Sequence, residues 1–266
     1  MVKKKIFYYE LTWPEIKEAV EKGKIPLLPI GSTEQHGPHL PLITDTFLAY
    51  SVCVKAAEKA SEDLLLMPPI CYGCSEHHMD FPGTISTEGE HFINYVYDVC
   101  KSISAHGFKR IIIVNGHGGN TPFLDVVIRR LSNETSSMYA MIPWWNLIVE
   151  EASKLRESEF PGGMAHSDEL ETSMMLHLKP ETVYMDKAVK EIGFQKSEFI
   201  WFDLMKKSPV YFFDPFSKMS KTGILGDPTV ATAEKGEKLL NAAINNLIRF
   251  VEEFKGRRIL PRIDHH

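Results

Sequence analysis

The segment from residue 31 to residue 45 carries side chains of the types that bind metal ions. Glu34 and His36 are two residues apart, so in an extended backbone they point to the same side and can reach one metal cluster. Asp45 follows at the start of an expected helix, where the helix dipole favours a carboxylate that could bridge two metals. Carboxylates and imidazoles together suit Zn, Mn or Fe(II). The spacing predicts a metal site, although Glu34 and His36 could also be ordinary loop residues and Asp45 a helix cap.

A second polar loop, Asn115–Asn120, places His117 among three glycines directly after an apolar run. The glycines leave room for the backbone to approach whatever the imidazole holds. They could equally serve a tight turn between a strand and a helix, with Asn120 as the helix cap. A phosphate-binding loop is a weak alternative, because the G-x-G-x-x-G spacing and the Walker lysine are both absent.

A third set of candidates surrounds the start of a helix after His166. Ser167 or Asp168 can cap this helix, and Asp168 and Glu169 suit its dipole, which accounts for these residues without any chemistry. Glu171 lies beside the start of an apolar run that should face the core. It is therefore a candidate inner carboxylate.

Four short apolar runs are expected to form strands, because each is rich in aliphatic residues and ends at turn or loop residues. They span Ile25–Ile30, Leu64–Pro68, Arg110–Val114 and Ser137–Ile142. Expected helices begin after Thr12 as N-cap and lie at about Phe47–Ala60, Glu88–His106, Thr121–Leu131, Glu169–Leu178 and Thr229–Phe254. This alternation predicts a three-layer α/β/α fold with a mostly parallel central sheet.

The chain shows no linker composition and no internal repeat, so residues 1–266 are expected to form a single domain. Ligands in such folds bind beyond the carboxyl ends of the strands. The polar loops Gly31–Asp45 and Asn115–Asn120 both leave from those ends. We therefore expect them to converge on one edge of the sheet.

Charge and composition limit the partners. The chain has 30 Lys and Arg residues against 35 Asp and Glu, a formal net charge of -5, and a mildly acidic surface argues against nucleic acid. No apolar stretch approaches the ~20 residues of a membrane span, and four cysteines do not make a disulfide framework in a chain of this length. We expect a cytoplasmic protein that acts on a small molecule, with neither nucleic acid nor membrane as partner.

Together these loops resemble the signature segments of the creatininase (creatinine amidohydrolase) family. The resemblance is carried by GSTEQHGPHLPL at 31–42 with Asp45, and by NGHGGN at 115–120. It extends to EH at 76–77, FPGTI at 81–85 and GDP at 226–228. The matching segments are spread from about Leu11 to Phe250, nearly the whole chain.

The resemblance implies a binuclear site with two divalent ions per chain, in a three-layer α/β/α fold that usually forms a homo-oligomer, often a hexamer. Glu34, His36, Asp45 and His117 fall on metal-ligand positions, with Asp45 bridging. His166 falls on the position of the catalytic histidine.

The chain departs from creatininase proper in two places. That enzyme has a carboxylate ligand two residues after the histidine of the second loop, where this chain has Gly119, and we expect Glu171 to supply the missing ligand. That enzyme also has a tryptophan shortly before the catalytic histidine, where this chain has PGGM at 161–164. Trp144 and Trp145 could line the pocket instead, with buried packing as the alternative.

Substrate contacts are expected from four residues near these loops: Ser75, His77, Trp145 and Gly118. His77 and its neighbour His78 lie in a loop that resembles the family's. A surface position is the default expectation for both histidines.

Two metals would activate water for attack on a carbonyl of a small polar substrate, and His166 would carry a proton to the leaving group. A cyclic amide or another C–N bond is the leading substrate. The alternatives are ring-opening hydrolysis of a cyclic keto-polyol such as a keto-inositol, and deformylation or peptide cleavage in cofactor biosynthesis. A structural metal-binding protein is the non-enzyme alternative, although structural zinc sites are typically closed and cysteine-rich.

Overall fold

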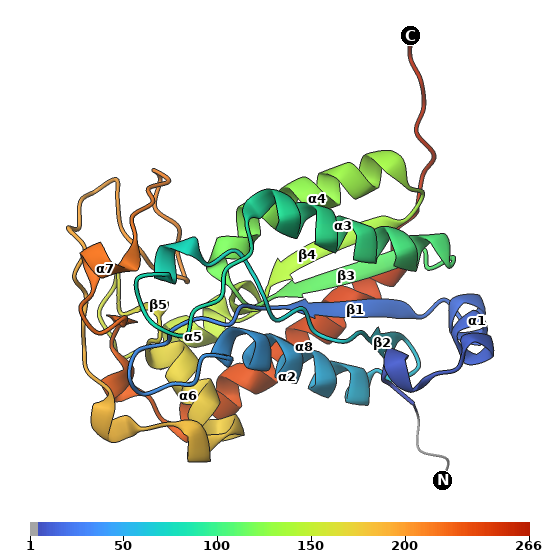
Figure 1. Cartoon of the computed structure of the whole chain (residues 1–266). Coiled ribbons are helices and arrows are strands. Elements are labelled where there is room, and N and C mark those ends of the chain that lie inside the picture. Colours follow the sequence, from blue (N-terminus) through green and yellow to red (C-terminus); the bar gives the residue numbers. More distant parts are fainter. Residues whose placement is uncertain (1–4) are drawn as a thin grey trace.

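The computed structural model describes residues 5–266, and its centre is a parallel sheet of four strands. The strands lie in the order β2-β1-β3-β4 (Figure 1). Their bounds are Ile25–Ile30 for β1, Leu64–Leu66 for β2, Arg110–Asn115 for β3 and Met138–Pro143 for β4. Parallel neighbours require crossover connections, and helices supply them. The expectation of a mostly parallel sheet is confirmed.

Successive strand residues point to opposite faces of the sheet, so apolar strand residues make both faces hydrophobic. Helices cover both of these faces. Leu27 and Ile112 belong to one hydrophobic cluster, and their neighbours Leu28 and Ile113 belong to another. The first face is covered by α2 (Thr44–Lys59), α6 (Glu169–Leu178) and α8 (Ala233–Gly256). The second is covered by α1 (Trp13–Glu21), α3 (Gly89–Ala105) and α4 (Thr121–Glu134). These are the three layers predicted from the sequence.

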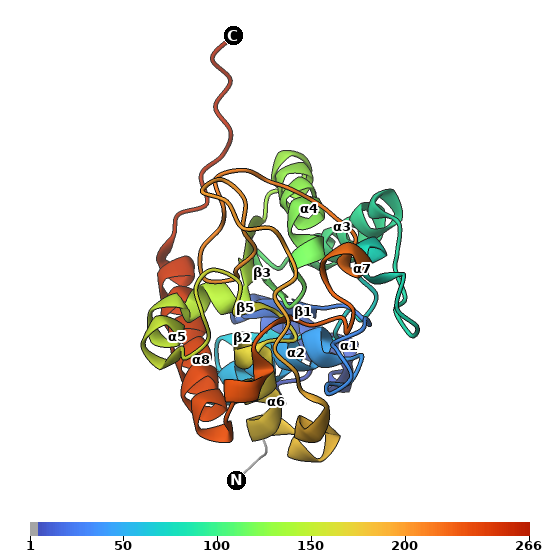
Figure 2. The same ribbon diagram turned by 90° about the vertical axis from the view of Figure 1, so that its left-hand side faces the viewer.

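A smaller, irregular region lies beyond the carboxyl ends of the strands, at the left of Figure 1 and facing the viewer in Figure 2. It contains the antiparallel pair β5 (Met164–His166) and β6 (Leu225–Gly226), and the one-turn helix α7 (Phe216–Met219). The helix α5 (Val149–Leu155) follows β4. The sequence patterns predicted none of these four elements.

Several predicted boundaries shift by a few residues. α2 begins at Thr44 rather than Phe47, so Asp45 lies in its first turn. β2 ends at Leu66, two residues before the predicted end at Pro68. The last helix begins at Ala233 rather than Thr229, because the side chain of Thr232 accepts a hydrogen bond from the Lys235 N–H and caps it there. Among the described residues, no helix is long and apolar enough to cross a membrane.

Candidate metal centre

The loops that follow β1 and β3 meet at one edge of the sheet, as expected. Ile30 pairs with Asn115, so the two strands end side by side. The backbone N–H of Gly116 donates to the Ile30 carbonyl at 2.7 Å and continues the contact into the second loop. Asp45 reaches this edge from α2, and Glu171 from the first turn of α6. Four chain segments therefore deliver side chains to one place.

Two groups of three side chains lie close enough to hold metal ions, and they share one carboxylate. In the first group, His117 Nδ1 is 3.1 Å from Glu34 Oε2 and 3.0 Å from Asp45 Oδ2. In the second, His36 Nε2 is 3.0 Å from Asp45 Oδ1 and 3.8 Å from Glu171 Oε2. The two oxygens of Asp45 face different groups, which is the geometry of a bridging ligand. All five residues predicted to bind metal are brought together.

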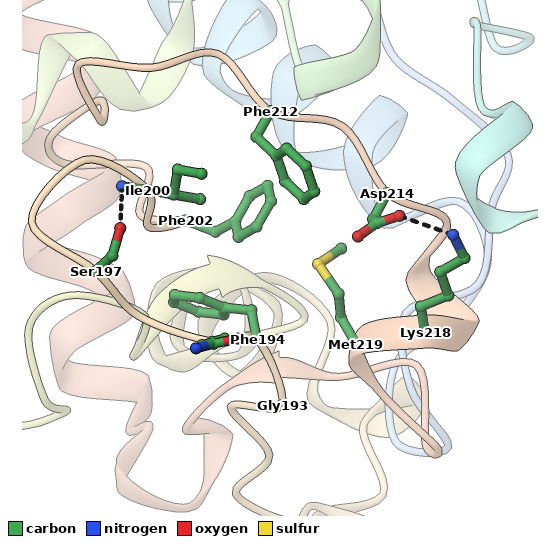
Figure 3. Close-up of a pocket in the computed structure, with 10 residues that line it drawn as sticks. Gly193, Phe194, Ser197, Ile200, Phe202, Phe212, Asp214, Lys218 and Met219 are labelled. Carbon is green, nitrogen blue, oxygen red and sulfur yellow. Dashed lines mark hydrogen bonds and ion pairs between the residues drawn. The ribbon is translucent and has the colours of Figure 1, made fainter.

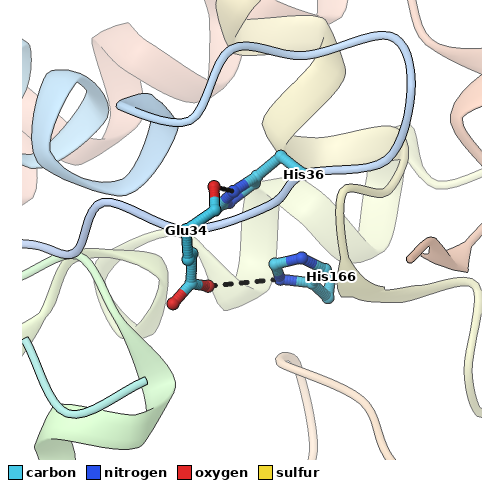
Figure 4. Close-up of side chains that lie close together, drawn as sticks. All are labelled: Glu34, His36 and His166. Carbon is cyan, nitrogen blue, oxygen red and sulfur yellow. Dashed lines mark hydrogen bonds and ion pairs between the residues drawn. The ribbon is translucent and has the colours of Figure 1, made fainter. Parts of the chain in front are cut away.

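His166 lies beside the same cluster, held by β5. Its Nδ1 is 3.7 Å from Glu34 Oε1 (Figure 4), and the centroids of the His166 and His36 rings are 4.3 Å apart. Glu34, His36 and His166 form a third group with ligand atoms within 4.8 Å of one another. The predicted catalytic histidine is therefore in reach of the predicted ligands.

The cluster contains several buried carboxylates, whose negative charge a bound cation would neutralise. Glu34, Asp45 and Glu171 are 0%, 2% and 5% exposed, and like charges in a shared buried space oppose ionisation. Glu34 Oε1 and Asp45 Oδ2 are buried and lie 3.3 Å and 3.0 Å from imidazole nitrogens of His78 and His117, but neither oxygen accepts a well-directed hydrogen bond from the described residues. Leaving buried charged oxygens unpaired costs free energy. A divalent ion at each group would satisfy them.

The pKa values report the same excess of negative charge. Burial alone would lower the pKa of His36, but Asp45, Glu171 and Glu34 outweigh it and raise this pKa to about 10. Burial also opposes the charged form of His117, yet Glu34 and Asp45 hold its pKa well above the usual value. Burial, together with the neighbouring carboxylates, raises the pKa of Glu171 to about 7. Without a metal, imidazole protons supply the positive charge, and a divalent cation can take their place.

Backbone carbonyls orient the two ligand histidines. His36 Nδ1 lies 3.2 Å from the Glu34 carbonyl oxygen, and His117 Nε2 lies 3.0 Å from the Cys74 carbonyl oxygen. A carbonyl only accepts hydrogen bonds, so each of these ring nitrogens is the donor. The other nitrogen of each ring faces the carboxylates. Outer contacts of this kind fix the tautomer of histidines in metal sites, so this donor set fits Zn, Mn or Fe(II).

Three of the four predicted substrate contacts lie beside the cluster. The Ser75 hydroxyl donates to Glu34 Oε2, and the His77 ring is stacked on the His117 ring with centroids 5.4 Å apart. Gly118 is exposed, and a Cβ added there would meet nothing within 4 Å. The space next to Gly118 is therefore open for a substrate.

Gly119 cannot be replaced by a carboxylate without rearrangement. A Cβ at this position would lie 2.4 Å from the Cys74 carbonyl oxygen and 2.4 Å from His117 Nε2. The hydrogen bond that orients His117 fills the space that a side chain would need. Glu171 lies 3.8 Å from His36 at this cluster, and its role as the missing ligand stays a prediction.

The remaining predicted contact, Trp145, lies in the larger hydrophobic cluster. It is 6% exposed, and its ring meets that of Trp144 edge-on with centroids 6.0 Å apart. This placement favours the packing role, and a substrate contact by Trp145 stays a prediction.

The default expectation of a surface position is wrong for His78, which is 1% exposed. Its Nε2 lies 3.3 Å from Glu34 Oε1. Phe216 of α7 was not singled out from the sequence at all, yet its ring centroid is 3.9 Å from that of His78 and 4.9 Å from that of His166. The loop that contains FPGTI was the available signal for His78, and a phenylalanine in an irregular segment gives no such signal.

A cavity of about 410 Å³, lined by both aromatic and polar residues, lies in the irregular region (Figure 3). Its lining includes Phe194, Phe202, Phe212 and Met219. Met219 belongs to the same short helix as Phe216, and both pack in one hydrophobic cluster with Phe194. The helix α7 therefore contacts the histidines through Phe216 and lines the cavity through Met219.

The fold and site define an α/β protein with a buried cluster of carboxylates and imidazoles at the carboxyl edge of a parallel sheet. A family model described as creatininase, or creatinine amidohydrolase, matches residues 9–251. The chain belongs to the creatininase family and is a hydrolase.

Similar proteins in this family carry several activities. The mycofactocin precursor peptide peptidase of Mycolicibacterium smegmatis is 35% identical, over 82% of this chain and 81% of that protein. The creatinine amidohydrolase of Pseudomonas putida is 28% identical, over 95% of this chain and 97% of that protein. A mutant creatininase of Zn-Zn type has a TM-score of 0.79 at 29% identity and covers 95% of this chain and 99% of that one. A manganese creatininase has the same TM-score and identity, over 94% of this chain and 99% of that one.

Proposed function

We propose that this protein is a metal-dependent hydrolase that cleaves a C–N bond next to a carbonyl group, as an amidohydrolase does. The observation that carries the proposal is the position of Asp45. Its Oδ1 lies 3.0 Å from His36 and its Oδ2 lies 3.0 Å from His117, so one carboxylate joins two groups of candidate ligands. Two-metal hydrolases use such bridged sites.

The proposed site holds two divalent ions per chain. Glu34, Asp45 and His117 would bind one, and His36, Asp45 and Glu171 the other. Solved relatives with zinc and with manganese support these metals. When bound, divalent ions at such a site polarise a carbonyl oxygen and make water nucleophilic near neutral pH.

The protein's own side chains would supply orientation and proton transfer. The Ser75 hydroxyl donates to Glu34 and holds its carboxylate toward the cluster. His166, 6% exposed, keeps its Nδ1 next to Glu34, where it can accept a proton from the attacking water and return it to the leaving amine. Burial, reinforced by His36, holds the pKa of His166 well below its usual value, so the ring starts as a base.

A small amide, cyclic or open, is the first candidate substrate, and His77 and the open space beside Gly118 would contact it. A peptide is the second candidate. It is supported by the 35% identity to a peptide peptidase and by the nearby cavity, whose rings Phe194, Phe202 and Phe212 would contact an apolar side chain. The expectations of a single domain, a homo-oligomer and a cytoplasmic location stay predictions.

A substrate panel on metal-defined protein tests the proposal. Protein stripped by chelator would be reloaded with Zn, Mn or Fe(II) and offered lactams, linear amides, N-formyl compounds, short peptides and cyclic ketones. We expect hydrolysis of at least one C–N substrate by the loaded protein and none by the stripped protein. If only the cyclic ketones are hydrolysed, the protein cleaves a C–C bond rather than the proposed C–N bond. Equal turnover without metal would contradict the metal dependence.

A further inference from the structure

The side chain of Gln35, which the sequence patterns did not single out, lies at the centre of the histidine cluster. It is 5% exposed. Its Nε2 lies 2.7 Å from His78 Nδ1, 3.1 Å from His166 Nε2 and 2.9 Å from the Gly223 carbonyl oxygen. Its Oε1 accepts a hydrogen bond of 2.9 Å from the backbone N–H of Gly37. One carboxamide thus joins two histidines and two backbone segments.

Two backbone groups fix which way round this amide lies. The Gly37 N–H can only donate and the Gly223 carbonyl can only accept, so the oxygen of Gln35 must face Gly37 and the nitrogen must face Gly223. Gly223 has φ +86°, and a Cβ there would lie 1.9 Å from Gln35 Oε1. Only glycine lets this carbonyl come so close. The orientation therefore follows from obligatory partners rather than from a choice between similar atoms.

The proton positions of His166 and His78 follow from this orientation. His166 Nε2 is 2.9 Å from the backbone carbonyl oxygen of Gln35, which only accepts, so Nε2 carries the hydrogen. A protonated Nε2 cannot accept from the Gln35 amide. One amide hydrogen goes to Gly223, and the other therefore goes to His78 Nδ1. His78 then carries its hydrogen on Nε2, which lies 3.3 Å from Glu34 Oε1.

We propose that Gln35 is a positioning residue that sets the tautomers of His166 and His78 around Glu34. Its main chain holds the hydrogen of His166 on Nε2, which leaves Nδ1 as the basic atom facing the cluster. Its side chain holds the hydrogen of His78 on Nε2, the nitrogen that lies 3.3 Å from Glu34 Oε1. Phe216 lies against both rings. The consequence for turnover rests on the proposed function, but the tautomers do not.

Neutron diffraction of the metal-loaded protein, exchanged into deuterated buffer, tests the assignment without any substrate. We expect deuterium on Nε2 of both His166 and His78 and none on Nδ1 of either ring. Deuterium on His166 Nδ1, or on His78 Nδ1, would overturn the proposal. The result does not depend on catalytic activity, because the experiment uses no substrate.

The variant Gln35→Glu tests the role of the side chain. A carboxylate keeps the shape and can still accept from the Gly37 N–H, but it can donate to neither His78 nor Gly223. We expect the hydrogen of His78 to move to Nδ1, toward the carboxylate, with both metals retained. For a hydrolysed substrate, kcat should fall by about 10–100-fold with little change in KM, the range for loss of an outer contact.

Asn246→Asp is the matched control, because Asn246 Nδ2 also donates to a backbone carbonyl, that of Leu147, at 2.7 Å. It should leave the tautomers and kcat unchanged. An unchanged His78 tautomer and unchanged kcat in Gln35→Glu would overturn the positioning role. If the variant does not fold, the neutron result on the unaltered protein still decides the tautomers.

Discussion

The two halves of the site are built in different ways. The loops after β1 and β3, with the first turns of α2 and α6, bring five charged or imidazole side chains to the end of a regular parallel sheet. The segment between α6 and α8 has only β6 and the short helix α7 among its α-helices and strands, and it contributes aromatic rings and a cavity. The first region holds groups that can bind metal, and His166 of β5 lies beside it as the group that can move protons, whereas the second region packs Phe216 against the histidines.

This difference predicts that changes in the first region remove metal or turnover, while changes in the second alter substrate preference. Asp45→Asn should have the largest effect, because Asp45 is common to both ligand groups. We expect affinity for both metals to fall by more than about 100-fold, beyond the range for outer contacts, and activity to fall with it. Metal analysis after dialysis measures the loss. Asp125→Asn, at an exposed ion pair with Arg129, should bind metal normally.

His166→Ala should reduce kcat by about 10²–10⁴-fold, the usual contribution of a general acid–base group. Both metals should remain, because His166 belongs to neither of the groups that share Asp45. Metal content and kcat would be measured on the same sample. Loss of one metal together with activity would reassign His166 as a ligand through its Nδ1.

Glu171→Gln should separate the two metals. The change removes charge but keeps shape, and Glu171 lies in the group with His36 but not in the group with His117. We expect one metal to bind at least about 10–100-fold more weakly while the other is retained. Titration with a competing chelator would show one tight and one weak metal site in the variant, against two tight sites in the unaltered protein. Two unchanged affinities would mean that Glu171 is not a ligand.

Phe212→Ala should have the smallest effect, and it tests whether the second region takes part in substrate recognition. Phe212 lines the cavity and is 45% exposed, so its removal should cost little stability. For a peptide substrate with an apolar side chain we expect KM to rise up to about tenfold with kcat nearly unchanged, the pattern for lost binding that is equal in ground and transition states. A small lactam should be unaffected. An equal loss for both substrates would remove the cavity from substrate recognition.

The same difference accounts for what the sequence could reveal. The runs Ile25–Ile30 and Arg110–Asn115 are nearly all buried, and buried parallel strands show as continuous apolar segments. The polar loops after them carry their ligands at fixed spacings. Glu171 was predicted as a ligand because it lies beside an apolar run that should face the core and because Gly119 lacks the carboxylate of creatininase proper. The part of the site that could be predicted from the sequence is therefore positioned mostly by regular strands and helices.

The rest of the site depends on contacts between distant segments. β5 and β6 have three and two residues, too short for a periodic pattern, and they pair across about sixty residues of chain. Phe216 and Gln35 act through neighbours that only the folded chain supplies. His78 has the same residue type as His77, yet one ring is buried and the other is partly exposed. Spacing along the chain carries no information about such contacts.

Anomalous diffraction at the Zn, Mn and Fe edges, on crystals of protein purified without chelator, tests the bridged metal site most directly. A bridged site should give two peaks on either side of the Asp45 carboxylate, one bound by Glu34 and His117 and the other by His36 and Glu171. A single peak, or two peaks that do not share Asp45, would contradict the bridged site. Full activity in crystals or solution with no metal at these side chains would contradict the proposed chemistry altogether.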